Sequence, residues 1–231
     1  MTVRVAAVIP VLNEAGAIGP TVSRLPRDII DAVIVVDGGS TDGTVAEACA
    51  AGAEVIEEAR AGYGRACLTG TACARELGTE VVLFLDGDGS DACERAGDLV
   101  RPVQDNEFDF VLASRTKGVR EPGSMLWHQV AAGWLIGRAV GVATGVAYTD
   151  MCAFRAIRLD TLEGLGMTEM GYGWNLEMQM RAARAKLRIR EIPLPYGRRL
   201  AGQSKVAGNL RGTLRAGSRI VRVLARLSRQ A

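Results

Sequence analysis

The chain has 231 residues, of which 48% are apolar and 23% are charged, a composition typical of a globular protein with one substantial core. The formal net charge of +2 hides an asymmetry. Glu191 is the last acidic residue, and nine of the 28 Lys and Arg residues follow it, which leaves 19 against 26 acidic residues in the body. An acidic body with a basic tail predicts an anionic partner, either phosphate groups or an anionic membrane surface. Nucleic acid is disfavoured, because no binding module with interleaved aromatic residues accompanies the charge.

The cysteine and histidine content excludes several kinds of site. The chain has five cysteines: Cys49, Cys67, Cys73, Cys93 and Cys152. They lack metal-site spacing and are expected to be reduced, mostly buried thiols in a cytoplasmic protein. Met1–Pro10 has the pattern of a strand rather than of a signal peptide. Because His128 is the only histidine, a Ser-His-Asp triad or a His-based metal site would have to be built on that residue.

Short apolar runs alternate with helical patterns along the first half of the chain. These runs predict five strands: Val3–Ile9, Ala32–Val36, Ala53–Ile56, Val81–Leu85 and Phe108–Ser114. The first and fourth of them are expected to be buried. Pro10 is expected to end the first strand. Helices are expected between the strands, including Gly62–Leu77 and a helix that begins at a capping box formed by Asp91 and Glu94. This alternation predicts βαβ units and an open, mostly parallel α/β sheet flanked by helices.

Acidic and polar loops follow three of the predicted strands: Asn13–Glu14, Asp37–Asp42 and Asp86–Asp91. The carboxyl ends of parallel strands share one edge of a sheet, and ligands bind at that edge. Asp86 and Asp88, separated by Gly87, are hard anions suited to a divalent cation that also holds a diphosphate. Any single loop could equally be a helix-capping turn, but three along one edge indicate a ligand site. The sequence has neither the G-x-G-x-x-G fingerprint nor a P-loop.

Four motifs carry a family resemblance: Val8–Glu14, Ile34–Thr44, Asp86–Asp88 and Ser114–Arg115. In this order they are similar to family 2 glycosyltransferases with the Rossmann-like GT-A fold, and the resemblance runs to about Lys205. Further motifs most resemble polyprenyl-phosphate sugar transferases of the dolichyl-phosphate mannosyltransferase type: Thr149–Asp150 with Phe154–Arg155, Gly173 with Glu177–Met178, and Gly202 with Ser204–Lys205. Two features depart from the family pattern. Gly38 replaces a second acidic residue, and Gly89–Asp91 differs from the longer loop of many lipid-phosphate members.

The resemblance implies a role for each matching residue. The donor nucleotide sugar would be bound by Pro10, Asn13, Glu14, Asp37, Gly39 and Asp86, with Asp37 reading the base. Mg²⁺ or Mn²⁺ would be held by Asp86 and Asp88, next to the donor diphosphate. Phosphate of the donor or of the acceptor would be met by Arg115, Arg198, Ser204 and Lys205. Asp88 and Glu177 would be the catalytic residues, and a hexose would be transferred by direct displacement with inversion.

The residues alone leave the acceptor open. A phosphate acceptor such as polyprenyl phosphate is already ionised and needs positioning by Arg and Lys side chains. A hydroxyl acceptor on a small molecule or glycolipid needs a general base, for which Glu177 is the candidate, although an ordinary helix carboxylate is an equal interpretation of that residue. A non-catalytic nucleotide-sugar-binding adaptor is a further alternative, against which the intact pair of Asp86 and Asp88 argues.

Two stretches have the composition of membrane-surface helices. Met125–Val146 carries two tryptophans but is broken by polar residues and glycines, so it predicts an interfacial or core-packing helix rather than a membrane span. It could equally be buried in a homo-oligomer. Leu210–Leu227 predicts a basic amphipathic helix, placed on a membrane surface or on the acidic body. The expected organisation is a GT-A domain over residues 1–205 and a basic helix over 206–231, bound peripherally to the inner face of the cell membrane.

Overall fold

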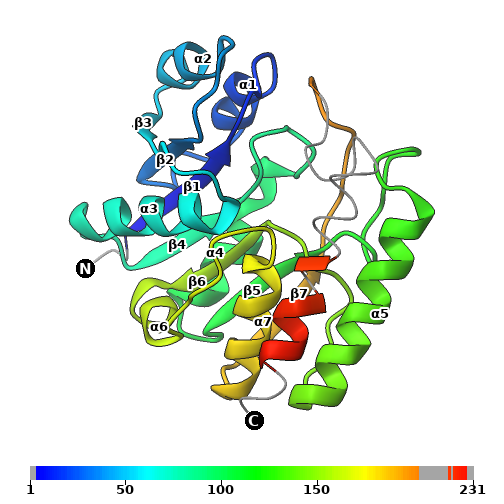
Figure 1. The fold of residues 1–231 in the computed structure, drawn as a ribbon. Helices are drawn as coiled ribbons and strands as arrows, with labels where there is room; N and C mark the ends of the chain where they lie inside the picture. Colours follow the sequence, from blue (N-terminus) through cyan, green and yellow to red (C-terminus); the bar gives the residue numbers. More distant parts are fainter. Residues whose placement is uncertain (1–3, 203–217, 220, 228–231) are drawn as a thin grey trace.

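A seven-stranded sheet forms the centre of the molecule (Figure 1). The computed structural model describes residues 4–202, 218–219 and 221–227. The strand order is β3-β2-β1-β4-β6-β5-β7. The strands are β1 (Val5–Val11), β2 (Ala32–Asp37), β3 (Glu54–Glu57), β4 (Val81–Phe84), β5 (Phe110–Ser114), β6 (Arg155–Arg158) and β7 (Ile189–Pro193).

Most neighbouring strands are parallel, which confirms the predicted α/β class. β1 is parallel to β2 and β4, β2 is parallel to β3, and β5 is parallel to β7. β6 is the exception, because it runs antiparallel between β4 and β5. No apolar run marks β6 in the sequence, since a fully buried arginine, Arg155, occupies its first position. The sheet is therefore mixed.

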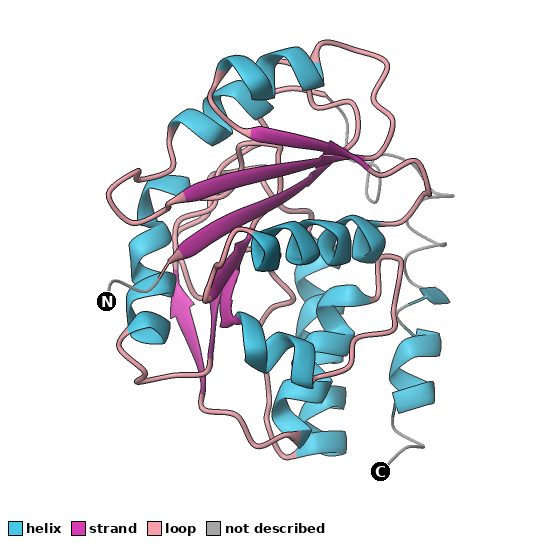
Figure 2. Cartoon of the chain, turned by 90° about the vertical axis from the view of Figure 1, so that its left-hand side faces the viewer, coloured by secondary structure: helices cyan, strands magenta, loops and turns pink. Residues whose placement is uncertain are grey.

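Helices cover both faces of the sheet (Figure 2). They are α1 (Ile18–Ser23), α2 (Thr44–Ala50), α3 (Tyr63–Glu76), α4 (Ala96–Gln104), α5 (Trp127–Thr144), α6 (Leu159–Gly164) and α7 (Trp174–Arg184), with a short 3₁₀ helix, η1 (Cys93–Arg95). Successive strand side chains point to opposite faces, so β1 contributes to two cores. Val5 and Ile9 pack on the side of α1 and α4, whereas Ala6 and Val8 pack on the side of α3 and α7. Three of the five cysteines are buried and all five are free thiols, as predicted.

The first strand continues through Pro10, so the predicted end of this strand is wrong. Pro10 lies in register with Val36, and β1 ends at Val11. In a parallel sheet, the N–H and C=O groups of one residue point to the strand on one side, and those of the next residue point to the strand on the other side. The carbonyl of Val8 accepts a hydrogen bond from the β4 side, so the missing N–H of Pro10 also faces that side. β4 has already ended at Phe84, opposite Val8, and the proline therefore costs the sheet no hydrogen bond.

The predicted capping box of Asp91 and Glu94 is also wrong. No side chain caps η1 or α4. Asp91 is buried and accepts hydrogen bonds from the backbone N–H of Asp86 (3.4 Å) and the Cys152 thiol (3.8 Å). Glu94 instead pairs with Arg24 at 2.7 Å. Burial among acidic neighbours thus overrides the local capping pattern.

The described part of the C-terminal segment, Ser218–Arg219 and Val221–Leu227, is helical. Val223 and Leu227 are buried, whereas Val221 is 65% exposed. This part of the helix packs on the body, and the predicted boundary between residues 205 and 206 stays a prediction. Within the described ranges, no helix has the length and apolar character needed to cross a membrane.

Candidate active site at the acidic edge of the sheet

The loops that follow β1 and β2 are tied together at the carboxyl edge of the sheet. The N–H of Asn13 donates to Oγ of Ser40, and that of Glu14 donates to Oγ1 of Thr44, both at 2.8 Å. In return, the amide oxygen of Asn13 accepts a hydrogen bond from the N–H of Thr41 at 2.8 Å. The structure therefore brings together the first two of the three predicted loops.

Asp37 organises its own loop at the end of β2. Its Oδ2 accepts hydrogen bonds from the N–H groups of Gly39 (3.1 Å) and Ser40 (2.9 Å), and its Oδ1 accepts one from the Ser40 hydroxyl. Gly39 has a φ of +90°, in the left-handed region that favours glycine, and no described atom outside its own backbone and chain neighbours lies within 4 Å of the position that a Cβ would take. A ligand can therefore approach the backbone at Gly39. The predicted contact of Asp37 with a base stays a prediction.

Asp86 and Asp88 follow β4 and lie beside these loops. The Oδ1 atom of Asp88 accepts a hydrogen bond from the N–H of Ser90 at 2.9 Å. A Cβ atom on Gly87 would lie 2.6 Å from a methyl group of Val11, so only glycine allows this close approach to β1. The sequence motif Asp-Gly-Asp therefore places two carboxylates at the same edge as the β1 and β2 loops.

Arg199 bridges two of the acidic loops, although the sequence motifs did not single it out. Its Nη1 donates to Oδ2 of Asp88 at 2.7 Å, and its Nη2 donates to Oε2 of Glu14. The backbone N–H groups of Leu200 and Gly197 donate to the carbonyl groups of Asp88 (2.9 Å) and Ser90 (2.8 Å). The segment that carries Arg199 thus lies across the carboxylate loop and supplies a cation to it.

The predicted phosphate ligand Arg198 lies elsewhere. Its backbone N–H donates to Glu121 at 2.9 Å, and its Nε donates to the carbonyl of Pro122 at 2.7 Å. Adjacent side chains of this extended segment point in opposite directions. The sequence alone cannot tell which of the two arginines faces the acidic loops. Ser204 and Lys205 lie outside the described residues.

Burial and like charge make the carboxylate edge receptive to a cation. Burial, followed by the neighbouring charge of Asp88, raises the pKa of Asp86 to about 6. Burial and the charge of Asp86 likewise raise the pKa of Asp91. No described residue donates a hydrogen bond to the side chain of Asp86. A divalent ion would relieve this repulsion, so the donor set fits Mg²⁺ or Mn²⁺.

The described residues would supply such an ion with only part of its ligands. In the ranges that the structure describes, no three His, Cys, Asp or Glu side chains converge as a complete metal site. Mg²⁺ commonly takes one or two carboxylates together with substrate phosphates. Asp86 and Asp88 would therefore hold the ion jointly with a bound diphosphate.

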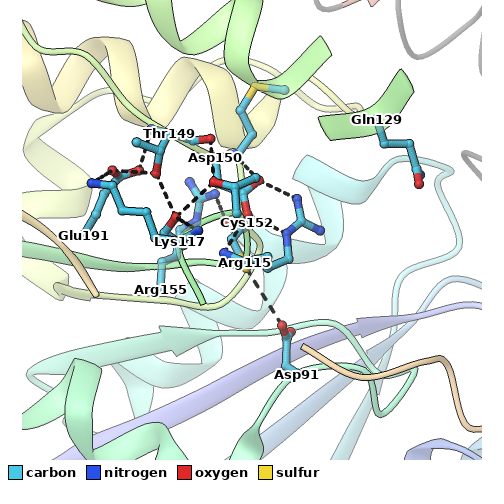
Figure 3. A network of polar contacts seen from close by, with 12 residues as sticks. Asp91, Arg115, Lys117, Gln129, Thr149, Asp150, Cys152, Arg155 and Glu191 are labelled. Atoms are coloured by element: carbon cyan, nitrogen blue, oxygen red, sulfur yellow. Dashed lines mark hydrogen bonds and ion pairs between the residues drawn. The ribbon is translucent and has the colours of Figure 1, made fainter. Parts of the chain in front are cut away.

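Arg115 belongs to a buried network beside this edge, shown in Figure 3. Its Nε and Nη2 donate to the two oxygens of Asp150, both at 2.7 Å, and its backbone N–H donates to the same carboxylate. The guanidinium lies 5.0 Å above the ring of Tyr196. Glu191 extends the network by accepting hydrogen bonds from Thr149 at 2.9 Å. This network fixes Arg115 in one orientation, and its predicted phosphate contact stays a prediction.

Glu177 is fully buried in α7 and bonded to protein groups. It accepts hydrogen bonds from the N–H and hydroxyl of Thr168, the N–H of Glu169 and Nε of Arg181, at 2.6 to 3.0 Å. Burial alone would raise its pKa, but these hydrogen bonds together lower the pKa below its ordinary value. None of these partners belongs to the three acidic loops. The base role of Glu177 stays a prediction, and its contacts are those of a structural carboxylate.

Comparison with known proteins identifies the family. The family model described as Glycosyl transferase family 2 matches residues 6–165. The chain belongs to glycosyl transferase family 2. It is therefore a glycosyltransferase, as its motifs predicted, and the matched region contains the three acidic loops.

Relatives and solved structures agree with this assignment. An uncharacterized glycosyltransferase of Mycobacterium tuberculosis is 34% identical over 214 residues, which cover 91% of this chain and 93% of the relative. Undecaprenyl-phosphate mannosyltransferase of Micrococcus luteus is 32% identical over 225 residues and 90% of each chain. Glucosyl-3-phosphoglycerate synthase of M. tuberculosis, crystallised with Mn²⁺, UDP-glucose and phosphoglyceric acid, superimposes with a TM-score of 0.75 at 20% identity, over 97% of this chain and 79% of that one. This likeness confirms the GT-A fold.

Proposed function

We propose that this glycosyltransferase moves a hexose from a nucleotide diphosphate sugar to a lipid phosphate such as polyprenyl phosphate, with Mg²⁺ or Mn²⁺. The observation that carries the proposal is the similarity to undecaprenyl-phosphate mannosyltransferase over 90% of both chains. The acidic edge supports the donor half of the reaction, since it combines a carboxylate pair with the guanidinium of Arg199.

The donor half of the reaction needs a counter-charge for the departing diphosphate. The divalent ion, when bound to Asp86 and Asp88, would neutralise that charge. Arg199 lies within hydrogen-bond distance of Asp88, so its guanidinium can donate to a diphosphate oxygen once that contact is exchanged. The open approach at Gly39 leaves room for the nucleotide beside the β2 loop.

The acceptor half needs no base if the acceptor is a phosphate. An ionised phosphate oxygen attacks the anomeric carbon of the sugar from the side opposite to the leaving diphosphate, which inverts the configuration. The new carbon–oxygen bond forms as the bond to the diphosphate breaks, and no proton has to be removed. The buried, hydrogen-bonded state of Glu177 agrees with this scheme. A hydroxyl acceptor would instead require a reachable base.

A hollow beside the Arg115 network supports a lipid acceptor. It has a volume of about 450 Å³ and is lined by Trp127, Val130, Ala131 and Trp134 of α5 and by Thr116, Lys117 and Thr149. Trp127 is 81% exposed and Trp134 is 54% exposed. Exposed tryptophans beside an apolar hollow fit the headgroup level of a membrane, which supports peripheral attachment at its inner face. Lys117 also lines the hollow, where it pairs with Glu191 at 3.3 Å and remains 51% exposed.

A donor screen tests this function. Purified protein with Mn²⁺ or Mg²⁺ is mixed with UDP- and GDP-sugars, with and without polyprenyl phosphate, and the released nucleotide diphosphate is measured. We expect release with one donor that rises sharply with the lipid. Asp88→Ala should abolish this release, whereas Asp28→Ala, which removes an exposed carboxylate outside the site, should not.

Two other outcomes would point to different functions. Release that ignores the lipid would move the acceptor to a hydroxyl group and make Glu177 the candidate base. No release with any donor would leave a nucleotide-sugar-binding adaptor. Full activity of Asp88→Ala with unchanged metal dependence would contradict the assignment of the metal site.

A further inference from the structure

The described C-terminal helix forms a basic hollow on the body, which we call the arginine pocket. Its volume is about 210 Å³, and it is lined by Glu169, Arg219, Arg222, Val223 and Arg226. The lining therefore combines three arginines with one glutamate, and Arg219 and Arg226 lie 2.7 Å and 3.9 Å from the Glu169 carboxylate. None of these residues belongs to the three acidic loops or to the segment that carries Arg199.

The carboxylates at the pocket are already neutralised by protein groups. Glu169 is 1% exposed and accepts a hydrogen bond from Nε of Arg219 at 2.7 Å. Glu177 lies behind it and pairs with Arg181 at 3.0 Å as well as with Arg226 at 3.3 Å. Because Arg181 already balances Glu177, the pocket keeps a surplus of positive charge.

Arg222 pairs with neither Glu169 nor Glu177. It is exposed, and its Nε donates to the carbonyl of Ser218 at 3.3 Å. No described residue accepts a hydrogen bond from its two terminal NH₂ groups or from those of Arg219. A guanidinium presents such groups as a planar fork that matches two oxygens of a phosphate.

The helix is held firmly enough to pre-organise these arginines. Val223 is buried against Gly173, where an added Cβ would lie 2.6 Å from a valine methyl group. Leu227 is also buried, and its carbonyl accepts a hydrogen bond from Arg184 of α7 at 2.6 Å. Rigid donors lose less conformational freedom on binding, which favours affinity.

We propose that the arginine pocket is a second anion site, which binds the phosphate group of a phospholipid headgroup or a free phosphate. The ligand chemistry follows from the surplus guanidinium donors and from the single, already paired carboxylate in the lining. Because this site shares no residue with the acidic edge, the proposal does not rest on the sugar-transfer reaction.

The test measures binding rather than catalysis. The full chain is titrated with inorganic phosphate by calorimetry, and it is sedimented with vesicles of phosphatidylcholine with or without phosphatidylglycerol. Arg222→Glu is the test variant, because it reverses the charge of an exposed arginine with no carboxylate partner. Arg101→Glu makes the same charge change on the exposed face of α4 and is the matched control. Thermal unfolding checks that both variants fold.

We expect Arg222→Glu to weaken binding by about fivefold or more, the effect of one basic side chain near an anionic surface, while Arg101→Glu retains it. Loss of both phosphate and vesicle binding would support the site with free phosphate as a sufficient ligand. Loss of vesicle binding alone, with no measurable phosphate binding by the unaltered protein, would support it with a headgroup as the ligand. Binding by Arg222→Glu equal to that of the unaltered protein, or no binding of either probe by the unaltered protein, would overturn the proposal.

Discussion

We predict that Arg199 competes with a metal ion for Asp88, so that removal of Arg199 tightens metal binding. In the absence of a donor, the ion must displace the guanidinium from Oδ2 of Asp88, to which it is bonded at 2.7 Å. A hydrogen bond to a charged group contributes about 1.5–3 kcal/mol. Arg199 keeps 25% of its side-chain exposure, so the lower end of this range applies. Since 1.4 kcal/mol is a factor of ten, Arg199→Ala should bind Mn²⁺ about tenfold more tightly without donor.

Turnover of the same variant should fall, because the diphosphate loses a cation that the metal does not replace. Calorimetric titration with Mn²⁺ and the donor-release assay together measure both effects. Arg198→Ala is the control, since that neighbouring side chain pairs with Glu121 and is 60% exposed. Equal Mn²⁺ affinity in the unaltered protein and in Arg199→Ala would refute the reasoning, because it would show that Arg199 does not occupy the metal position on Asp88.

Four further variants separate structural from chemical roles. Because the pKa of Asp86 is raised to about 6, the metal-free protein should lose stability as the pH rises from about 4 through about 6. Asp86→Asn should abolish the contribution of Asp86 to this loss. Thermal unfolding at a series of pH values measures the difference. Gly64→Ala should cost about 1–3 kcal/mol in denaturant unfolding. The reason is that its Cβ would lie 2.2 Å from the carbonyl oxygen of Glu169. Gly164→Ala, with open space around it, should instead gain about 0.5–1 kcal/mol. Glu177→Gln should lower the melting temperature but keep its turnover with a phosphate acceptor, whereas a drop of about 100-fold or more would identify a base.

The parts of the fold with local signals were predictable from the sequence. β1, β2 and β4 are apolar runs, and the polar residues after them had to meet at one edge once these strands were parallel. The Asp86 and Asp88 motif was found for the same reason. These features depend on residues within a few positions of one another, where side-chain period and turn chemistry decide the structure.

The parts that depend on distant contacts were not predictable. Arg199 reaches Asp88 across 111 positions of the chain, and no short motif records such a pairing. The resemblance instead pointed to the neighbouring Arg198, which binds Glu121 and Pro122. Asp91 has the spacing of a helix cap, but burial beside Asp86 and Cys152 gives it other partners. Glu177 lies at a motif position and is nevertheless buried among hydrogen-bond donors that come from the preceding loop and its own helix.

The bridge from Arg199 to Asp88 also bears on how the chain is made. A ribosome releases the carboxylate loop 111 residues before it releases the arginine, an interval of roughly ten seconds at ~10 residues per second. During that interval the acidic loops have been synthesised, but Arg199, which pairs with Asp88 in the folded chain, has not. A divalent ion that meets the emerging chain then finds Asp88 unguarded. We therefore expect Asp88 to be more accessible to a cation during synthesis than in the folded chain.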